Sequence, residues 1–231
     1  MSHPNEETSI VLSGDWTSPE AERLSAAWFS AMAMEHKLPP EVRYMDGMSG
    51  KKYRYLINNL VASTSDARYL EIGCWAGSTA CSAMWGNKLK ATCIDNWSEL
   101  GGPRDRFVTN TNAVRTPDID FTLIEQDFNT VDVSKLGKFN IYMFDGPHDE
   151  RDQYNGIALY QQALDDTYIL IVDDWNGDQV RNGTLQALID LNNTVLASIE
   201  IVTRRNDTVH PEVYGQYSDW HNGYFIAVIQ K

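Results

Sequence analysis

Cysteine is scarce in this chain, and long apolar runs are absent. Only three of the 231 residues are cysteines, Cys74, Cys81 and Cys93, and no C-x-x-C motif occurs. This argues against a disulfide framework and against a cysteine-bound zinc site, and favours reduced thiols. No apolar run approaches the length of a membrane span, and residues 1–9 lack the apolar core of a signal peptide. We therefore expect a cytoplasmic protein with no membrane partner.

Basic residues are also few. The chain has 19 Lys and Arg against 32 Asp and Glu, which gives a net charge of −13 and an isoelectric point near 4.7. Binding to a nucleic acid needs a positive surface, so we expect no nucleic-acid partner. The acidity also fits bound divalent cations or a salty environment, and composition alone does not separate these alternatives.

What is present is the composition of a globular protein with a real core, since 42% of the residues are apolar. Residues 1–16 have the polar character of a loose lead-in. Thr17, Ser18 and Pro19 then form a helix-start signal, and apolar spacing predicts helices over about 17–37 and 51–63. We expect residues 1–64 to form a helical extension or lid, and residues 65–231 to form one α/β domain.

From residue 69 onward, short apolar strands alternate with helical stretches. This alternation predicts a mostly parallel sheet with helices on both faces. The expected strands are 69–72, 90–94, 119–124, 139–144 and 168–172, and the expected helices are 78–85, 105–114, 149–164 and 179–191. Two further strands, 197–203 and 224–230, have no helix between them and should form an antiparallel pair at one edge.

A glycine-containing loop follows the first of these strands, in the sequence Y-L-E-I-G-C-W-A-G-S-T at residues 69–79. Glycine allows a sharp turn and leaves room for a ligand, and ligands of open α/β sheets bind at the carboxyl ends of strands. Neither G-x-G-x-x-G nor G-x-x-x-x-G-K-S/T occurs here, which disfavours a dinucleotide or a nucleoside triphosphate. Instead Glu71 precedes Gly73, and a carboxylate at that place suits a cationic amine.

This loop resembles the first motif of class I S-adenosylmethionine (SAM)-dependent methyltransferases, D/E-x-G-x-x-x-G. The resemblance implies a Rossmann-like methyltransferase sheet with SAM as the cofactor, although an ordinary strand–helix turn with two glycines is the plain alternative. Asp95 ends the next strand 24 residues after Glu71, where an acid can accept ribose hydroxyl groups. The predicted cofactor residues are Glu71, Gly73, Cys74, Gly77, Ser78, Asp95, Asn96, Trp97, Asp127 and Phe128.

Three aspartates end the fourth and fifth strands of the predicted parallel sheet. If these strands are neighbours, Asp145, Asp173 and Asp174 converge. Carboxylates that lie so close together repel each other unless a cation neutralises them. Oxygen ligands favour Mg²⁺ or another hard divalent cation, which would lower the pKa of an acceptor hydroxyl group and align it. The plain alternative is that these aspartates cap the helices that follow.

The stretch F-D-G-P-H-D-E-R-D-Q-Y, followed by L-I-V-D-D-W, narrows the resemblance to metal-dependent O-methyltransferases of the macrocin type. It implies Asp145, Asp173 and Asp174 as metal ligands and methylation of a small-molecule or sugar hydroxyl. Asp145 and His148 are the candidate catalytic residues. Alternatives are a metal-independent methyltransferase, a non-catalytic SAM-binding protein and an NAD or nucleotide-sugar enzyme. For the N-terminal helices and the aromatic segment 204–223, the alternatives are a cover over the ligand or a homo-oligomer contact, and the apolar residues of the N-terminal helices could also be plain core.

Overall fold

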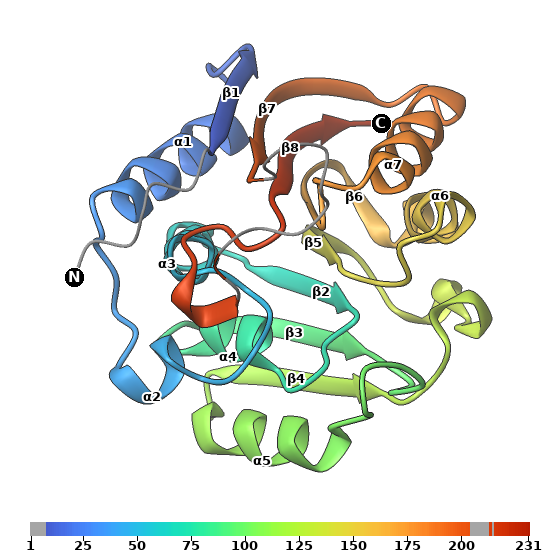
Figure 1. The fold of residues 1–231 in the computed structure, drawn as a ribbon. Coiled ribbons are helices and arrows are strands. Elements are labelled where there is room, and N and C mark those ends of the chain that lie inside the picture. The colour runs from blue at the N-terminus through green and yellow to red at the C-terminus, as the bar shows by residue number, and fades with distance from the viewer. Residues whose placement is uncertain (1–7, 204–212, 214) are drawn as a thin grey trace.

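The computed structural model describes residues 8–203, 213 and 215–231, which form one eight-stranded sheet with helices on both faces (Figure 1). The strand order across the sheet is β1-β7-β8-β6-β5-β2-β3-β4. The strands are β1 (Ser9–Gly14), β2 (Arg68–Ile72), β3 (Leu89–Ile94), β4 (Ile119–Ile124), β5 (Phe139–Phe144), β6 (Leu164–Asp173), β7 (Thr194–Val202) and β8 (Tyr224–Gln230). His3 in the N-terminal segment and His210 and Tyr214 in the aromatic segment 204–223 lie outside the described residues.

Strands β4, β3, β2, β5 and β6 run parallel, and β8, β7 and β1 continue the sheet in antiparallel pairing. The chain direction therefore brings the carboxyl ends of β2, β3, β5 and β6 to one edge, where the glycine loop and the aspartates were expected. The predicted fold class, a mostly parallel α/β sheet with an antiparallel edge, is confirmed.

Side-chain alternation along the strands builds a separate core on each face of the sheet. On β5, Ile141 and Met143 join the core shared with the N-terminal helices, whereas Tyr142 and Phe144 join the opposite core. The first core is covered by α1 (Pro19–Met32), α3 (Lys51–Ser63), α4 (Ser78–Met84) and α5 (Arg104–Val114), and the second by α6 (Glu150–Ala158) and α7 (Asp178–Asp190).

The structure corrects the expected N-terminal elements. The lead-in prediction is wrong for β1, whose six residues pair antiparallel with β7, some 190 residues later in the chain. The first helix ends at Met32 rather than near residue 37, because Met34 turns into the left-handed region with φ 61°. The helix expected over 149–164 is shorter, since α6 ends at Ala158 and β6 already begins at Leu164.

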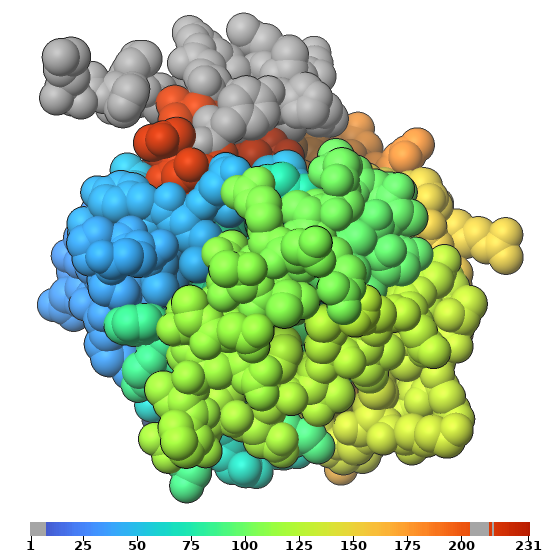
Figure 2. Space-filling view, turned by 90° about the horizontal axis from the view of Figure 1, so that it is seen from below, coloured from blue at the N-terminus to red at the C-terminus, as the bar shows by residue number. Residues whose placement is uncertain are grey.

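The N-terminal helices do not form a core of their own, because α1 and α3 bury their apolar residues against the strands of the sheet. The short helix α2 (Pro40–Arg43) connects them. Seen from below, the segments around α5 (green) lie beside the N-terminal segment (blue), which in turn meets the segment around η4 (Gly215–Tyr217; red) (Figure 2). Among the described residues, no helix is both long and apolar enough to cross a bilayer.

Candidate active site

The glycine loop has the backbone that its sequence predicts. Gly73 and Gly77 have φ values of 80° and 86°, a region that favours glycine, and α4 begins directly afterwards at Ser78. A side chain on Gly73 would also overlap the main-chain carbonyl of Asp145, so the loop after β2 and the loop after β5 touch through their backbones. The Asp145 amide in turn donates to the Ile72 carbonyl at 2.8 Å.

Asp95 fastens this loop to the end of β3. Its Oδ2 accepts hydrogen bonds from the amides of Cys74 (2.7 Å) and Trp75 (2.9 Å), and its Oδ1 accepts one from Trp97 (2.7 Å). A carboxylate offers about four acceptor positions, so three are used within the protein and about one is left for a ligand hydroxyl. The side-chain oxygen of the neighbouring Asn96 accepts hydrogen bonds from the amide and the hydroxyl of Ser98.

Glu71 lies beneath the loop and is 1% exposed. The hydroxyl of Tyr69 donates to its Oε2 at 2.7 Å. Burial, against the opposing effect of the Tyr69 hydrogen bond and with a smaller contribution from the charge of Asp95, raises the pKa of Glu71 to about 8. Among the described residues, no basic side chain forms an ion pair with Glu71, so a cationic group placed here would neutralise its carboxylate.

Trp75 within the loop and Trp97 after β3 each have a positive φ angle. The indole of Trp97 donates to the Trp75 carbonyl at 2.9 Å, and the indole of Trp75 donates to the Leu100 carbonyl at 3.0 Å. Arg106 on α5 lies 5.5 Å from the ring centre of Trp75 and pairs with Asp46 at 2.6 Å. Trp75 is therefore connected through Arg106 to the segment that precedes α3.

That segment, residues 45–50, lies on the start of α4. The hydroxyl groups of Ser49 and Ser78 are 3.1 Å apart and buried, and a side chain at Gly47 would overlap Ser78. The buried guanidinium of Arg54 holds the segment by hydrogen bonds to Ser49 and to several main-chain carbonyls, including that of Met45 at 2.7 Å. Ser78, predicted as a cofactor residue, is thus 5% exposed and faces this segment.

Asp127 and Phe128 occupy different environments. Asp127 is exposed and caps the 3-10 helix η1 (Phe128–Thr130) by accepting from the Asn129 amide at 2.9 Å. Phe128 is 7% exposed and packs edge-on against Phe144, at 5.4 Å between ring centres. A cavity of about 380 Å³ opens nearby on the β3–β4 face, lined by Lys90, Thr92, Thr122, Ile124, Gln126, Val131, Asp132, Lys135 and Leu136. None of the predicted site residues lines it.

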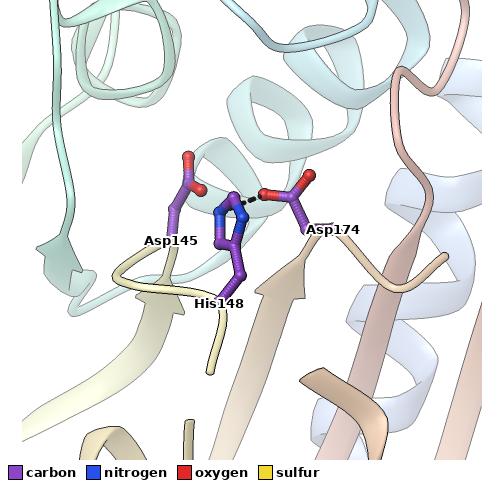
Figure 3. Close-up of side chains that lie close together, drawn as sticks. All are labelled: Asp145, His148 and Asp174. Atoms are coloured by element: carbon purple, nitrogen blue, oxygen red, sulfur yellow. Dashed lines mark ion pairs between the residues drawn. The ribbon is translucent and has the colours of Figure 1, made fainter. Parts of the chain in front are cut away.

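At the ends of β5 and β6, the structure brings together Asp145, His148 and Asp174 (Figure 3). The imidazole of His148 lies between the two carboxylates, and one ligand atom from each of the three residues lies within 4.8 Å of the others. His148 Nε2 is 2.8 Å from Asp174 Oδ2. The Asp174 hydrogen bond raises the pKa of His148, whereas burial raises the pKa of Asp145 well above its usual range.

Asp173 is oriented differently from Asp174. It continues the face of Ile169 and Ile171 toward the α3 side of the sheet and is 4% exposed. Its Oδ1 accepts from the Asp174 amide at 2.7 Å, and burial raises its pKa well above the usual range. The group of described residues that could hold a metal therefore contains His148 in place of the predicted Asp173.

The residues around this group fit a cation. The donor set of two carboxylates and one imidazole suits a divalent cation such as Mn²⁺ or Mg²⁺. Asp174 has a φ of 56°, an uncommon conformation for a residue other than glycine. Burial disfavours its charge, but hydrogen bonds from His148 and Asn222 outweigh this and lower the pKa of Asp174.

Several residues of this site were not predicted from sequence. Asn222 Nδ2 donates to Asp174 Oδ1. Tyr224, on β8 directly opposite Asp173, is fully buried, and its hydroxyl has no hydrogen-bond partner among the described residues. Its ring stacks on Tyr53 of α3 at 4.1 Å between ring centres. A single Asn or Tyr at these positions forms no sequence motif. Their place at the site follows only from the pairing of β8 with β6.

Fold and glycine loop together define the class I SAM-dependent methyltransferase architecture, and the comparisons with known proteins agree. Residues 70–175 match the family described as a methyltransferase domain. A search of curated proteins gave no match in sequence. The family match covers less than half of the chain, and the structural neighbours share its fold.

Three solved structures illustrate the likeness of the fold. A putative O-methyltransferase from Klebsiella pneumoniae has a TM-score of 0.54 and 15% identity, with 93% of this chain and 91% of that chain covered. The O-methyltransferase TomG from Streptomyces achromogenes, solved with SAM, has a TM-score of 0.52 and 14% identity over 91% and 90%. A putative SAM-dependent methyltransferase from Streptococcus mutans has a TM-score of 0.52 and 14% identity, and this chain covers only 48% of the length of that chain.

Proposed function

We propose that this chain is a SAM-dependent methyltransferase that methylates a hydroxyl group of a small molecule with the help of a divalent cation. The observation that carries the proposal is the meeting of the two halves of the site. The glycine loop lies in backbone contact with Asp145, and Asp145 is grouped with His148 and Asp174. A methyl donor at the loop and an acceptor at the aspartates would therefore be neighbours.

SAM supplies an electrophilic methyl group that the acceptor oxygen displaces directly. The residues of this chain would bind and orient it. Glu71 provides a buried carboxyl group that would lose its proton when a cationic group binds, and Asp95 keeps about one acceptor position for a ribose hydroxyl. Gly73 and Gly77 allow the positive φ angles of the turn, while Trp97 lies beside the loop and Asp127 lies exposed after β4.

The carboxylates of Asp145 and Asp174 and a ring nitrogen of His148 would hold the cation. When bound, a divalent cation lowers the pKa of a coordinated hydroxyl group and fixes its orientation. Asp173 supports the group by accepting the Asp174 amide. Mg²⁺ remains one candidate, and Mn²⁺ suits the mixed oxygen and nitrogen ligands at least as well.

A second candidate is a metal-independent methyltransferase in which His148 is the general base. The 2.8 Å contact between His148 and Asp174 favours it, because a carboxylate that accepts from one ring nitrogen orients the imidazole and strengthens it as a base. In this version Asp145 would bind the acceptor rather than a cation.

The acceptor is proposed to be a small molecule. The net charge of −13 disfavours a nucleic-acid substrate, and TomG, of the same fold, is an O-methyltransferase involved in tomaymycin synthesis. We further propose that residues 1–64 act as a cover over the ligand and that the protein works in the cytoplasm. A homo-oligomer stays an alternative use of the exposed residues on α1, among them Phe29 at 63% exposure.

Thermal unfolding and calorimetry test the proposal. SAM and S-adenosylhomocysteine should each raise the melting temperature, and NAD should not; a response to NAD alone would overturn the SAM assignment. Turnover of hydroxyl-containing acceptors that is lost in EDTA and restored by Mn²⁺ or Mg²⁺ would support the cation. Turnover that is indifferent to EDTA but lost in His148→Ala would favour the metal-independent version. Binding of SAM without turnover of any hydroxyl, amine or carboxyl acceptor would instead indicate a non-catalytic protein.

A further inference from the structure

The segment before β8 crosses the end of β6 and is fastened there by its main chain. The amide of Asn176 donates to the Asn222 carbonyl at 3.0 Å, and the amide of Trp175 donates to the Gly223 carbonyl at 3.3 Å. These two hydrogen bonds hold the turn after β6 in place without any contribution from the side chain of Asn222. The Asn222 side chain is therefore free to serve a different purpose.

That side chain points to the Asp174 carboxylate. Asn222 Nδ2 donates to Oδ1, while His148 Nε2 lies 2.8 Å from Oδ2, so each oxygen has its own partner. The Asp174 amide is held by Asp173 at 2.7 Å. Asp174 is thus held by three contacts. Its backbone lies in the left-handed region, where a residue with a side chain is strained and needs stabilising contacts of this kind.

The chemistry of the amide also fits this role. A carboxylate that binds a cation must keep one orientation, and a neutral donor can fix it without adding a charge that competes with the cation. Groups that hold a metal ligand from behind in this way change metal affinity by about 10- to 100-fold when they are removed. Among the described residues, Asn222 is the neutral side chain that donates a hydrogen bond to the Asp174 carboxylate.

We propose that Asn222 is a positioning residue, which orients Asp174 for binding a divalent cation together with Asp145 and His148. This inference rests on the proposed metal-assisted function. It assigns a role to a residue in the turn before the antiparallel strand β8, outside the strand ends of the parallel part.

Mn²⁺ binding, followed by the loss of the free-ion signal in electron paramagnetic resonance, tests the inference on the full chain. Wild type is compared with Asn222→Ala and with Asp174→Asn. The second of these variants should abolish Mn²⁺ binding. The matched control is Asn193→Ala, because Asn193 also makes side-chain hydrogen bonds, to Gln161, but lies at the far end of β7. Melting temperature and affinity for S-adenosylhomocysteine are measured for each variant to verify that it is folded.

We expect Asn222→Ala to bind Mn²⁺ about tenfold or more weakly than wild type, with the affinity for S-adenosylhomocysteine unchanged and Asn193→Ala like wild type. If Asn222→Ala does not fold, Asn222→Ser replaces it. The serine side chain is too short for its hydroxyl to reach Asp174, so the same loss of Mn²⁺ affinity is expected. Equal Mn²⁺ affinity in wild type and variant would overturn this inference alone. No Mn²⁺ binding in wild type would overturn the metal-assisted function, and this inference with it.

Discussion

The hydroxyl of Tyr69 donates to the carboxyl of Glu71 at 2.7 Å, and neither side chain is more than 1% exposed. The two residues are neighbours on one face of β2, since side chains two apart on a strand point the same way. Burial raises the pKa of Glu71 to about 8, so the buried carboxyl keeps its proton at neutral pH until a cation arrives.

This relationship predicts a pH dependence of stability. Between the ordinary value of 4.5 and about 8, the folded protein holds a proton that the unfolded chain has lost. The free energy of unfolding therefore falls as pH rises through this window, by up to about 1.4 kcal/mol per pH unit for one group. Urea unfolding between pH 5 and 8 should show a smaller fall in the free energy of unfolding for Glu71→Gln than for wild type. Glu125→Gln, at an exposed carboxylate, is the control, and equal slopes in Glu71→Gln and wild type would contradict the expectation.

Gly73 predicts a large effect of one methyl group. Gly73→Ala should destabilise the protein severely, because the side chain both enters a left-handed backbone and overlaps the Asp145 carbonyl. Gly86 has φ 64° but no atom near the place of a side chain, so Gly86→Ala should cost only the backbone strain, about 1–2 kcal/mol. Chemical denaturation of both variants separates the overlap from the strain. Similar losses for the two would argue against the backbone contact.

Arg106 predicts a change in the release of the cofactor. It joins Asp46 to Trp75, so Arg106→Ala should loosen residues 45–50 over the start of α4. Because the ion pair is exposed and the ring contact is modest, the affinity for S-adenosylhomocysteine should fall by at most about tenfold, mainly through faster dissociation. Stopped-flow fluorescence measures that rate. Asp46→Asn should reproduce part of the effect, and an unchanged rate in both variants would show that the segment is held by Arg54 alone.

His148 predicts how cation binding depends on pH. Its pKa is raised from 6.5, first of all by the hydrogen bond to Asp174, so the imidazole is protonated at mildly acidic pH and must lose its proton to bind a metal. Mn²⁺ affinity should therefore rise with pH through a midpoint above 6.5. Calorimetry in buffers of different ionisation enthalpy counts the protons released. His148→Ala should bind more weakly and release fewer protons, and an unaltered proton count would remove His148 from the ligand set.

The sequence predicted the elements whose signals are local. The helix Lys51–Ser63 was expected over the same residues from apolar spacing, and the strand Phe139–Phe144 from its apolar run. Strand β1 was missed because its six residues are short, partly polar and paired with a distant strand. The period of two along β6 could have shown that Asp173 faces the α3 side with Ile171, whereas Asp174 lies beyond the regular strand. Asn222 and Tyr224 depend on long-range pairing, which no local pattern encodes.

The backbone contact between Gly73 and Asp145 has a thermodynamic consequence. Two binding loops that share a wall cannot shift independently, because a displacement of either one is passed to the other at close packing. If the methyl donor and the cation each settle their own loop, their affinities are linked. Linkage is reciprocal, so a cation that tightens binding of the donor by some factor must itself bind more tightly by the same factor when the donor is present.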